Sequence, residues 1–431
     1  MSTLYERDEA VIAGIEKLRF FPLEVVSGHG CTLVTPDGRE LLDLSATWTA
    51  SGLGHGHPAI VDAVSRAVKT APGSGGLSAV HPDSVGLAED LLSLVPGSGE
   101  RRVYLGHAGS DANDVALRAC RHATGRHTVI AFEHSYHGGV GVAMGVSGVH
   151  VDAGAAPDPD VVFLPYPNPF RPTPAGVDAD VTACLTLAEQ HLAGGSIACL
   201  IVEPILSDGG LVVPPDGFLA QLHELCRSHD VPMICDEVKM GLGRPGTLHA
   251  FEHDGVVPDI VTFGKVLGGG LPLSAAVGPA ALLDNPPAAA LLTTAGNPVC
   301  TAAGRAVLAT IVGEQLPERA AKVGAVLQDA LRTLDSDTIG EVRGRGLAIG
   351  LELVDPATGE RDPRLAAQVV YRAWELGAVV YYVGGNVLEI TPPLVLSEAE
   401  AVRAAEIIGA AIADAAAGKV DAQEVARYAG W

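Results

Sequence analysis

Short apolar runs alternate with helical patterns through the middle of the chain. The runs are rich in β-branched and aromatic residues and are bounded by turn residues, a pattern that predicts buried strands. They are Val103–Leu105, Thr128–Phe132, Val161–Leu164, Cys199–Glu203, Pro232–Asp236, Ile260–Phe263 and Leu273–Val277. Helical patterns separate most of them, for example over Asp111–His122, Val181–Leu192 and Phe218–His229. This alternation predicts an α/β fold with a mainly parallel, seven-stranded sheet that helices cover on both faces.

The two ends of the chain follow a different pattern. The N-terminal part predicts a helix over Val11–Leu18 and a hairpin over Cys31–Leu44. The part after residue 300 predicts a helix over Thr301–Val312 that resumes after a break, strands near Glu341–Leu353 and Val379–Tyr382, and a last helix over Glu398–Ala416. We therefore expect a large domain at residues 56–315 and a smaller α+β domain at 316–431, completed by the N-terminal segment 1–55.

Composition narrows the class of protein. The net charge of -23 argues against a nucleic acid partner. No apolar run approaches the length of a membrane span, and the mixed, charged residues 1–20 do not have the pattern of a secretory signal. The seven cysteines are scattered, with no CxxC pair. We interpret them as reduced thiols of a cytoplasmic protein.

Lys265 follows the end of the apolar run Ile260–Phe263 and precedes three glycines, Gly268 to Gly270. Ligands of open α/β sheets bind at the carboxyl ends of the strands. An amine that is held there, partly out of water, has the setting of a Schiff-base lysine. The alternative is a surface lysine in a glycine-rich loop.

Two further motifs follow predicted strands. Gly109 and Ser110 open a helix, where backbone N–H groups and a hydroxyl could hold a phosphate, although Ser110 could simply cap the helix. Tyr136 follows the second strand and could stack on a planar cofactor or pack in the core. Thr293 begins the stretch TTAGNP, which is either a second phosphate contact or a capped helix start.

Asp236 ends a strand whose interior is apolar, and a buried carboxylate needs a partner. A protonated pyridine nitrogen would be a suitable one. A structural ion pair with Arg244 is the alternative. The pattern H-x-x-E-H at His249–His253 matches an inverted zinc-protease motif, but no third ligand can be named, so no metal is predicted.

These motifs occur in one order that resembles the class III aminotransferase family. The glycine-serine loop, YHG at 136–138, IVEP at 201–204, DEV at 236–238, Lys265 with GGGLP, and TTAGNP all contribute, with Asp236 and Lys265 29 residues apart. The resemblance spans nearly the whole chain. It implies pyridoxal 5'-phosphate as cofactor, fold type I, and a homodimer or larger assembly with shared active sites.

The resemblance also implies residue roles. Lys265 would form the Schiff base with the cofactor, and Asp236 would pair with the pyridine nitrogen. The remaining cofactor contacts would come from Gly109 and Ser110 at the phosphate, Tyr136 and Val238 on the ring faces, Glu203 of IVEP, and Thr293 at the phosphate of the neighbouring subunit. Lys239 stands where many relatives have glutamine; the resemblance would place it near the ring hydroxyl and assigns it no role.

Two positions depart from the aminotransferase pattern. Glu389 stands where aminotransferases of this family have an arginine that binds the substrate carboxylate, and no arginine lies between Ala378 and Leu396. Asp208 stands where relatives often have glutamate. Both departures resemble the α-amino-ε-caprolactam racemases, as do YERD near the N-terminus, KLRFFPL (17–23), DEVKMGL (236–242), YYVGGNVLE (381–389) and the terminal AGW.

The resemblance implies a racemase of a lactam or of α-amino acid amides. Lys265 and Asp208 would act as bases on opposite faces of the substrate carbon, and Trp48 and Tyr136 would form apolar walls. Asp208 could instead be a turn carboxylate, and Glu389 could point to solvent or pair with a basic residue. Competing activities are an aminotransferase and a free amino-acid 2-epimerase. A non-catalytic remnant that binds the cofactor is a further alternative, against which the intact Lys265 and Asp236 argue.

Overall fold

A seven-stranded sheet forms the centre of the computed structural model, which describes residues 3–73 and 76–428. In spatial order its strands are β4 (Arg101–Gly106), β10 (Ser274–Pro279), β9 (Ile260–Phe263), β8 (Met233–Asp236), β7 (Ile197–Val202), β5 (Thr128–Phe132) and β6 (Val161–Leu164). The pairs from β9 to β6 are parallel, whereas β10 is antiparallel to both of its neighbours. The predicted α/β fold with a mainly parallel seven-stranded sheet is confirmed.

Alternate residues of the central strands pack on opposite faces of this sheet. Val129 and Ala131 of β5 pack in the cluster that includes Leu117 of α4 (Gly109–Thr124). Phe132 packs on the other face, with its ring centroid 6.3 Å from that of Phe218, the first residue of α8 (Phe218–Ser228). Both faces are therefore apolar, which explains why these strands read as continuous apolar runs in the sequence.

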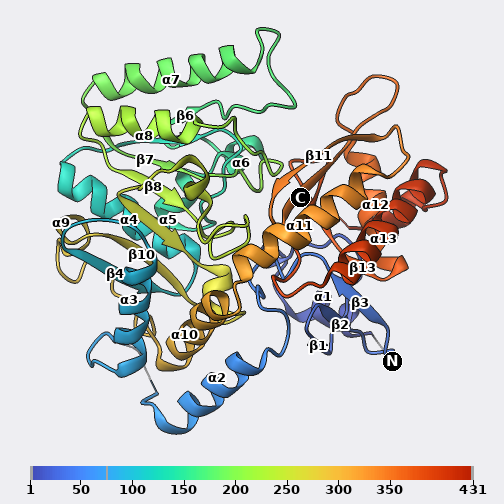
Figure 1. Ribbon diagram of the computed structural model, residues 1–431, viewed down its shortest axis with the longest axis horizontal. Helices are drawn as coiled ribbons and strands as arrows, with labels where there is room; N and C mark the ends of the chain where they lie inside the picture. The colour runs from blue at the N-terminus through green and yellow to red at the C-terminus, as the bar shows by residue number, and fades with distance from the viewer. Residues whose placement is uncertain (1–2, 74–75, 429–431) are drawn as a thin grey trace.

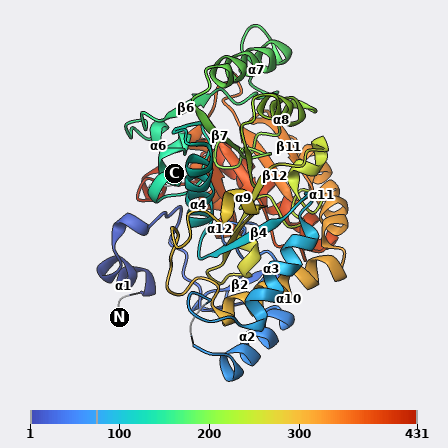
Figure 2. The ribbon, with the colours of Figure 1, turned by 90° about the vertical axis from the view of Figure 1, so that its left-hand side faces the viewer.

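The other helices of this part of the chain surround the sheet (Figures 1 and 2). They are α2 (Pro58–Thr70), α3 (Pro82–Leu94), α5 (Gly141–Gly145), α6 (Gly148–Asp152), α7 (Val177–Ala193), α9 (Ala280–Leu283) and α10 (Pro298–Gly313). Helices α7 and α8 lie at one end of the molecule and α2 lies at the other (Figure 2). Over residues 3–73 and 76–428, the helices are too short or too polar to cross a membrane.

The C-terminal part forms a second sheet with its own helices. Its elements are α11 (Leu316–Arg332), β11 (Ile339–Arg345), β12 (Ala348–Leu353), α12 (Pro363–Leu376), β13 (Ala378–Val379), β14 (Tyr381–Val383), β15 (Val387–Ile390), α13 (Glu398–Ala416) and α14 (Ala422–Val425). Strands β11, β12, β15 and β14 form an antiparallel sheet. Helix α13 has the predicted bounds, because Ser397 and Glu400 form a capping box at its start. The sequence reading missed β15, which carries Glu389 in its centre.

The N-terminal segment packs against the C-terminal part. Strands β1 (Ser27–His29), β2 (Thr32–Val34) and β3 (Glu40–Asp43) form a third sheet, and β2 and β3 are the predicted hairpin. β13 pairs with β3 in parallel, so residues from both ends of the chain share one sheet (Figure 1). The domain boundaries at residues 55 and 315 stay a prediction.

The predicted helix over Val11–Leu18 is wrong. The helix of this region, α1, spans Leu4–Val11, because Thr3 and Glu6 form a capping box that starts it earlier. Ile12 is extended and ends the helix, and a short 3₁₀ turn follows at Gly14–Glu16. Residues 11–18 are exposed or half-buried, so their apolar spacing did not mark a face that packs in the core. The terminal AGW lies outside the described residues.

A glycine in α11 provides a test of how this helix packs. A Cβ atom at Gly324 would lie 2.0 Å from the carbonyl oxygen of Gly346, which is backbone and has no rotamer to move. We expect Gly324→Ala to lower the free energy of unfolding by about 1–3 kcal/mol, the usual range for overpacking. Urea unfolding followed by circular dichroism measures it.

The control is Gly313→Ala at the last position of α10, where a Cβ atom would meet nothing within 4 Å. Alanine favours the helical conformation over glycine, so this variant should be neutral or gain up to about 1 kcal/mol. Equal stability of the two variants would contradict the packing described for α11.

Candidate active site

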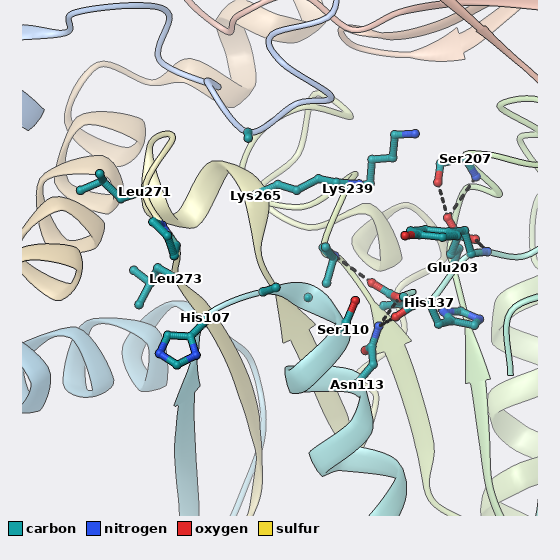
Figure 3. Close-up of a pocket in the computed structure, with 18 of the residues that line it drawn as sticks. His107, Ser110, Asn113, His137, Glu203, Ser207, Lys239, Lys265, Leu271 and Leu273 are labelled. Carbon is teal, nitrogen blue, oxygen red and sulfur yellow. Dashed lines mark hydrogen bonds and ion pairs between the residues drawn. The ribbon is translucent and has the colours of Figure 1, made fainter. Parts of the chain in front are cut away.

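A cavity of about 370 Å³ lies at the carboxyl ends of the central strands (Figure 3). Parallel strands direct the loops that follow them to the same edge of a sheet, so residues far apart in sequence meet there. The lining contains seven residues that were predicted for the site, namely Gly109, Ser110, Tyr136, Glu203, Asp236, Val238 and Lys265. It also contains Asn113, His137 and Ser207, which were not predicted for the site, and Lys239, which the resemblance placed near the ring hydroxyl without a role.

Lys265 starts the 3₁₀ helix η3 (Lys265–Gly268), two residues after β9 ends. Its φ of 44° is in the left-handed region, which a residue with a Cβ atom adopts only where the surroundings enforce it. Burial lowers the pKa of the Lys265 amine, and the nearby ammonium of Lys239 lowers it further. A larger neutral fraction makes this amine a better nucleophile than an ordinary lysine.

The Asp236 carboxylate is held by three donors. Its Oδ2 accepts a hydrogen bond from Asn113 Nδ2 at 2.7 Å and lies 2.8 Å from His137 Nδ1, and its Oδ1 accepts from the backbone N–H of Val238 at 2.9 Å (Figure 3). The alternative partner Arg244 donates to the carbonyl of Pro392 instead. The Asp236 carboxylate is thus held in place in the cavity lining by these donors and forms no ion pair with Arg244.

Asn113 and His137 are partners that the sequence reading missed. Asn113 lies one helical turn after Gly109 in α4, and its Oδ1 accepts a hydrogen bond from Thr262 Oγ1 at 2.7 Å, which fixes the orientation of the amide. His137 follows Tyr136 and is completely buried, and its Nε2 has no hydrogen-bond partner in the described residues. The motifs GSDAN and YHG contained both residues, but nothing in the sequence indicated that they converge on Asp236.

The start of α4 forms one end of the cavity. Asp111 accepts hydrogen bonds from the two backbone N–H groups that precede the helix, at 2.8 and 3.0 Å. The N–H groups of Gly109 and Ser110 belong to the first helical turn, which has no intrahelical acceptor to offer them. A Cβ atom at Gly109 would lie 2.5 Å from Val238, so only glycine allows this close approach. This end can bind an anion.

Glu203 connects Tyr136 to the turn that follows β7. It accepts hydrogen bonds from the backbone N–H of Tyr136 at 2.9 Å and from the N–H of Ser207 at 3.1 Å, and it also contacts the Ser207 hydroxyl. Burial raises the pKa of Glu203 to about 7. Its contacts hold the backbone at Tyr136, so Glu203 positions the aromatic side of the cavity.

Lys239 is the centre of a buried cluster of charges. Its Nζ lies 3.0 Å from Asp208 Oδ1 and 2.8 Å from Glu389 Oε1, and it lies 5.2 Å from the centroid of the Trp48 ring. All three charged side chains are buried. Asp208, Glu389 and Trp48 are therefore brought together as predicted for the substrate end, but they contact Lys239, which lines the cavity, and do not line it themselves.

The pKa values in this cluster are shifted in different directions. Burial alone would lower the pKa of Lys239, but the carboxylates of Asp208 and Glu389 outweigh it and raise this pKa. Burial disfavours the charge on Asp208, yet the two lysines, Lys239 and Lys265, lower its pKa below the usual range. Burial raises the pKa of Glu389, and Lys239 offsets this only in part. Asp208 is thus the stronger acid of the two.

Thr293 does not reach the cavity of its own chain. It is exposed on the loop before α10, where the neighbouring Thr294 hydroxyl lies 2.9 Å from His107 Nε2. Its contact with a second subunit stays a prediction. His249 and His253 each lie next to a backbone carbonyl, of Leu94 and Pro245 respectively, and no group of three potential metal ligands occurs in residues 3–73 and 76–428.

The lining fits the predicted cofactor. The free N–H groups at the start of α4 suit a phosphate, the fixed Asp236 carboxylate suits a protonated ring nitrogen, and the amine of Lys265 suits a Schiff base. Gly109 keeps the space between the helix and Val238 open. These three groups lie in one cavity, so a single molecule with an anionic end and a basic ring could use all of them.

Comparisons with known proteins identify the family. The model of the class III aminotransferases matches residues 15–412. An alanine/serine racemase of Pyrococcus horikoshii is 35% identical over 98% of this chain and 92% of its own length. A leucine/methionine racemase of Thermococcus litoralis is 33% identical over 99% of both chains. A 4-aminobutyrate aminotransferase of Mycobacterium leprae is 33% identical over 88% of both.

Solved structures agree with this result. An engineered, thermostable omega transaminase has a TM-score of 0.89 at 26% identity, over 96% of this chain and all of the other. A phospholyase from Arthrobacter in complex with phosphoethanolamine has a TM-score of 0.87 at 30% identity, over 95% and 99%. The predicted fold type I and the pyridoxal-phosphate cofactor are thereby confirmed. The chain belongs to the class III aminotransferase family of pyridoxal-phosphate enzymes, which includes both racemases and aminotransferases.

Proposed function

We propose that this chain is a pyridoxal-phosphate racemase of neutral α-amino acid derivatives, either amino acid amides or a lactam such as α-amino-ε-caprolactam. The observation that carries the proposal is the charge at the substrate end, where Asp208 and Glu389 share the single ammonium of Lys239. None of the described residues that line the cavity is arginine. Neither carboxylate lines the cavity, but both contact Lys239, which does. A substrate carboxylate beside Lys239 would therefore be repelled by two nearby carboxylates, whereas a neutral amide would not be.

Pyridoxal phosphate, when bound, withdraws electrons from the substrate and so acidifies the proton at Cα. The chain's own residues would then move that proton. Lys265 reaches the cavity from η3 after β9, and Asp208 belongs to the turn after β7, so the two groups come from different strands. With one of them removing the proton and the other returning it on the opposite face, the configuration at Cα inverts.

Asp208 is buried beside the two lysines of the cavity, which lower its pKa and so keep it ionised, the form that can accept a proton. The same shift makes Asp208 a weaker base than an ordinary aspartate. Lys239 Nζ holds its Oδ1 at 3.0 Å, and the Ser207 hydroxyl donates to its Oδ2 at 3.3 Å. These contacts orient the carboxylate. They support a role beyond capping a glycine turn.

A racemase or epimerase of free amino acids is the first competing function. The names of three relatives favour it, since they are an alanine/serine racemase, a leucine/methionine racemase and an isoleucine 2-epimerase. For such a substrate, the Lys239 ammonium would have to leave its carboxylate partners and bind the substrate carboxylate. An aminotransferase is the second competing function, and the similarity to a 4-aminobutyrate aminotransferase favours it. An aminotransferase differs from a racemase in the atom that receives the proton, which is a carbon of the cofactor instead of Cα.

One assay separates these functions. A single enantiomer of an amino acid amide is incubated with the holoenzyme without any 2-oxo acid, and optical rotation is followed. The proposal expects the rotation to fall to zero with no net loss of amide. The matching free acid racemising faster would favour the first competitor. Amine transfer to added pyruvate, with no racemisation in its absence, would favour the second.

Lys265 is expected to carry the cofactor. Its pKa is lowered whereas that of Lys239 is raised, so Lys265 is the better nucleophile of the two amines in the cavity. Borohydride reduction of the holoenzyme followed by peptide mapping should find the pyridoxyl group on Lys265. A label on Lys239 would contradict the assignment. In Lys265→Ala, no reduced adduct should form at either position.

Asp208→Asn is expected to keep the cofactor and lose racemisation by roughly 10²–10⁴, the factor that general base catalysis supplies. The amide preserves the shape of the side chain but cannot accept a proton. The measurements are the bound cofactor absorbance and kcat for racemisation. Asp216→Asn is the control, because Asp216 is an exposed carboxylate that pairs with Arg345 on the surface. Near-full activity of Asp208→Asn would leave Lys265 as the single base.

Glu389 is expected to select the neutral substrate. Because it contacts Lys239, an arginine at position 389 alone would place two cations together, so the paired variant Lys239→Gln/Glu389→Arg is the appropriate test. Wild type should prefer the amide over the free acid in kcat/KM, and the paired variant should shift that ratio toward the acid by at least about tenfold, or 1.4 kcal/mol. Lys239→Gln alone is the control. An unchanged ratio would show that Glu389 is not the selector.

A further inference from the structure

Four consecutive residues that follow β3 have left-handed backbone conformations. Ala46, Thr47, Trp48 and Thr49 have φ angles of 47°, 54°, 55° and 69°. None of them is glycine, and two are β-branched. This region of backbone space is unfavourable for any residue with a Cβ atom, and most of all for β-branched ones. Such a run persists only where the surroundings hold it in place.

Asp43 provides that hold. It is completely buried, and its Oδ1 accepts hydrogen bonds from the N–H groups of Ser45 and Ala46, both at 2.9 Å, and from the Ser45 hydroxyl at 3.0 Å. Its Oδ2 lies 2.8 Å from His55 Nε2. One oxygen therefore fixes the start of the left-handed turn, and the other fixes the chain just after it. Two backbone hydrogen bonds of 2.8 Å, from Thr49 to Ser45 and from Ser51 to Ala46, close the turn.

The turn meets the active site at three points. Trp48 lies over Lys239, with the Nζ atom 5.2 Å from the ring centroid, and stacks on Tyr381 at 4.7 Å. Ala50 lines the cavity. A Cβ atom at Gly52 would lie 2.1 Å from a methyl group of Val266, in the 3₁₀ helix that Lys265 starts. A shift of this turn would therefore move the ring beside Lys239, the lining residue Ala50 and the neighbour of the Lys265 helix together.

We propose that Asp43 is a positioning residue of the active site, whose carboxylate keeps the turn at residues 46–49 left-handed and thereby holds Trp48 over Lys239. The position of Trp48 matters for the substrate because its ring packs beside Lys239, whose ammonium the proposed function places next to the substrate, so this part of the inference rests on that proposal. Asp43 does not contact the reacting groups. Its loss should therefore appear mainly in KM and in the environment of Trp48, and much less in kcat.

The experiment uses the holoenzyme with Trp374 and Trp431 replaced by phenylalanine, so that Trp48 is the one remaining tryptophan of the three in the chain. Asp43→Ala removes both acceptor oxygens, and Asp43→Asn keeps the acceptor for Ser45 and Ala46 while removing the charge beside His55. We expect acrylamide to quench Trp48 more strongly in Asp43→Ala, with Asp43→Asn intermediate. KM should rise by about tenfold in Asp43→Ala while kcat changes by less than about threefold.

A glycine substitution tests the cause. Thr47 is exposed, and glycine adopts the left-handed conformation without steric penalty. Asp43→Ala/Thr47→Gly should therefore recover much of the shielding of Trp48 and of KM, and it also provides a folded protein should Asp43→Ala alone be too unstable. The control is Asp362→Ala, which removes a carboxylate that caps α12 through the Leu365 N–H at 2.9 Å, away from the cavity. It should lower Tm and leave KM and quenching unchanged.

Unchanged quenching of Trp48 in Asp43→Ala would overturn the proposal and leave Asp43 as a residue for stability alone, like Asp362. Failure of rescue by glycine would also overturn it, since the conformation of the turn would then not be what Asp43 controls. Quenching is measured without substrate. If amides prove not to be substrates but Asp43→Ala still exposes Trp48, the proposed function fails while the positioning role stands.

Discussion

The buried carboxylate of Asp236 joins three segments around the large sheet at the cavity. Its partners come from α4 (Asn113), from the loop after β5 (His137) and from its own loop after β8 (Val238), and Asn113 is in turn bonded to β9 through Thr262. A buried carboxylate without such donors would be strongly destabilising. The network therefore fixes the relative positions of the phosphate end, the ring end and the strand that leads to Lys265.

The sequence predicted those parts of the site that follow directly from single strands. Lys265 and Asp236 each lie at the end of a short, uninterrupted apolar run, and a strand buried on both faces has this appearance whatever its neighbours are. Gly109 and Ser110 were found because a helix start is a local signal. The strands of the large sheet were located to within two residues at each end for the same reason.

What the sequence did not reveal depends on contacts between distant residues. Asn113 and His137 lie 123 and 99 residues from Asp236, and no local pattern indicates that they meet it. Glu389 was expected to face the substrate, with pairing to a basic residue as the alternative. The structure has it in contact with Lys239, on a strand that the sequence reading missed because a buried charge interrupts its apolar pattern. The N-terminal helix was misplaced because α1 buries no residue, so its sequence has no apolar pattern by which it could be located.

Lys265 lies in the connection between β9 and β10, which pair with each other in antiparallel fashion from Phe263 and Ala275 onward. The loop that carries Lys265 is therefore the tip of a hairpin whose two strands lie inside the seven-stranded sheet and not at its edge. Separating these two strands requires breaking central strand pairs, which are usually among the last parts of a protein to open. The two anchor points of the Lys265 loop, at Phe263 and Ala275, should thus be as long-lived as the fold itself.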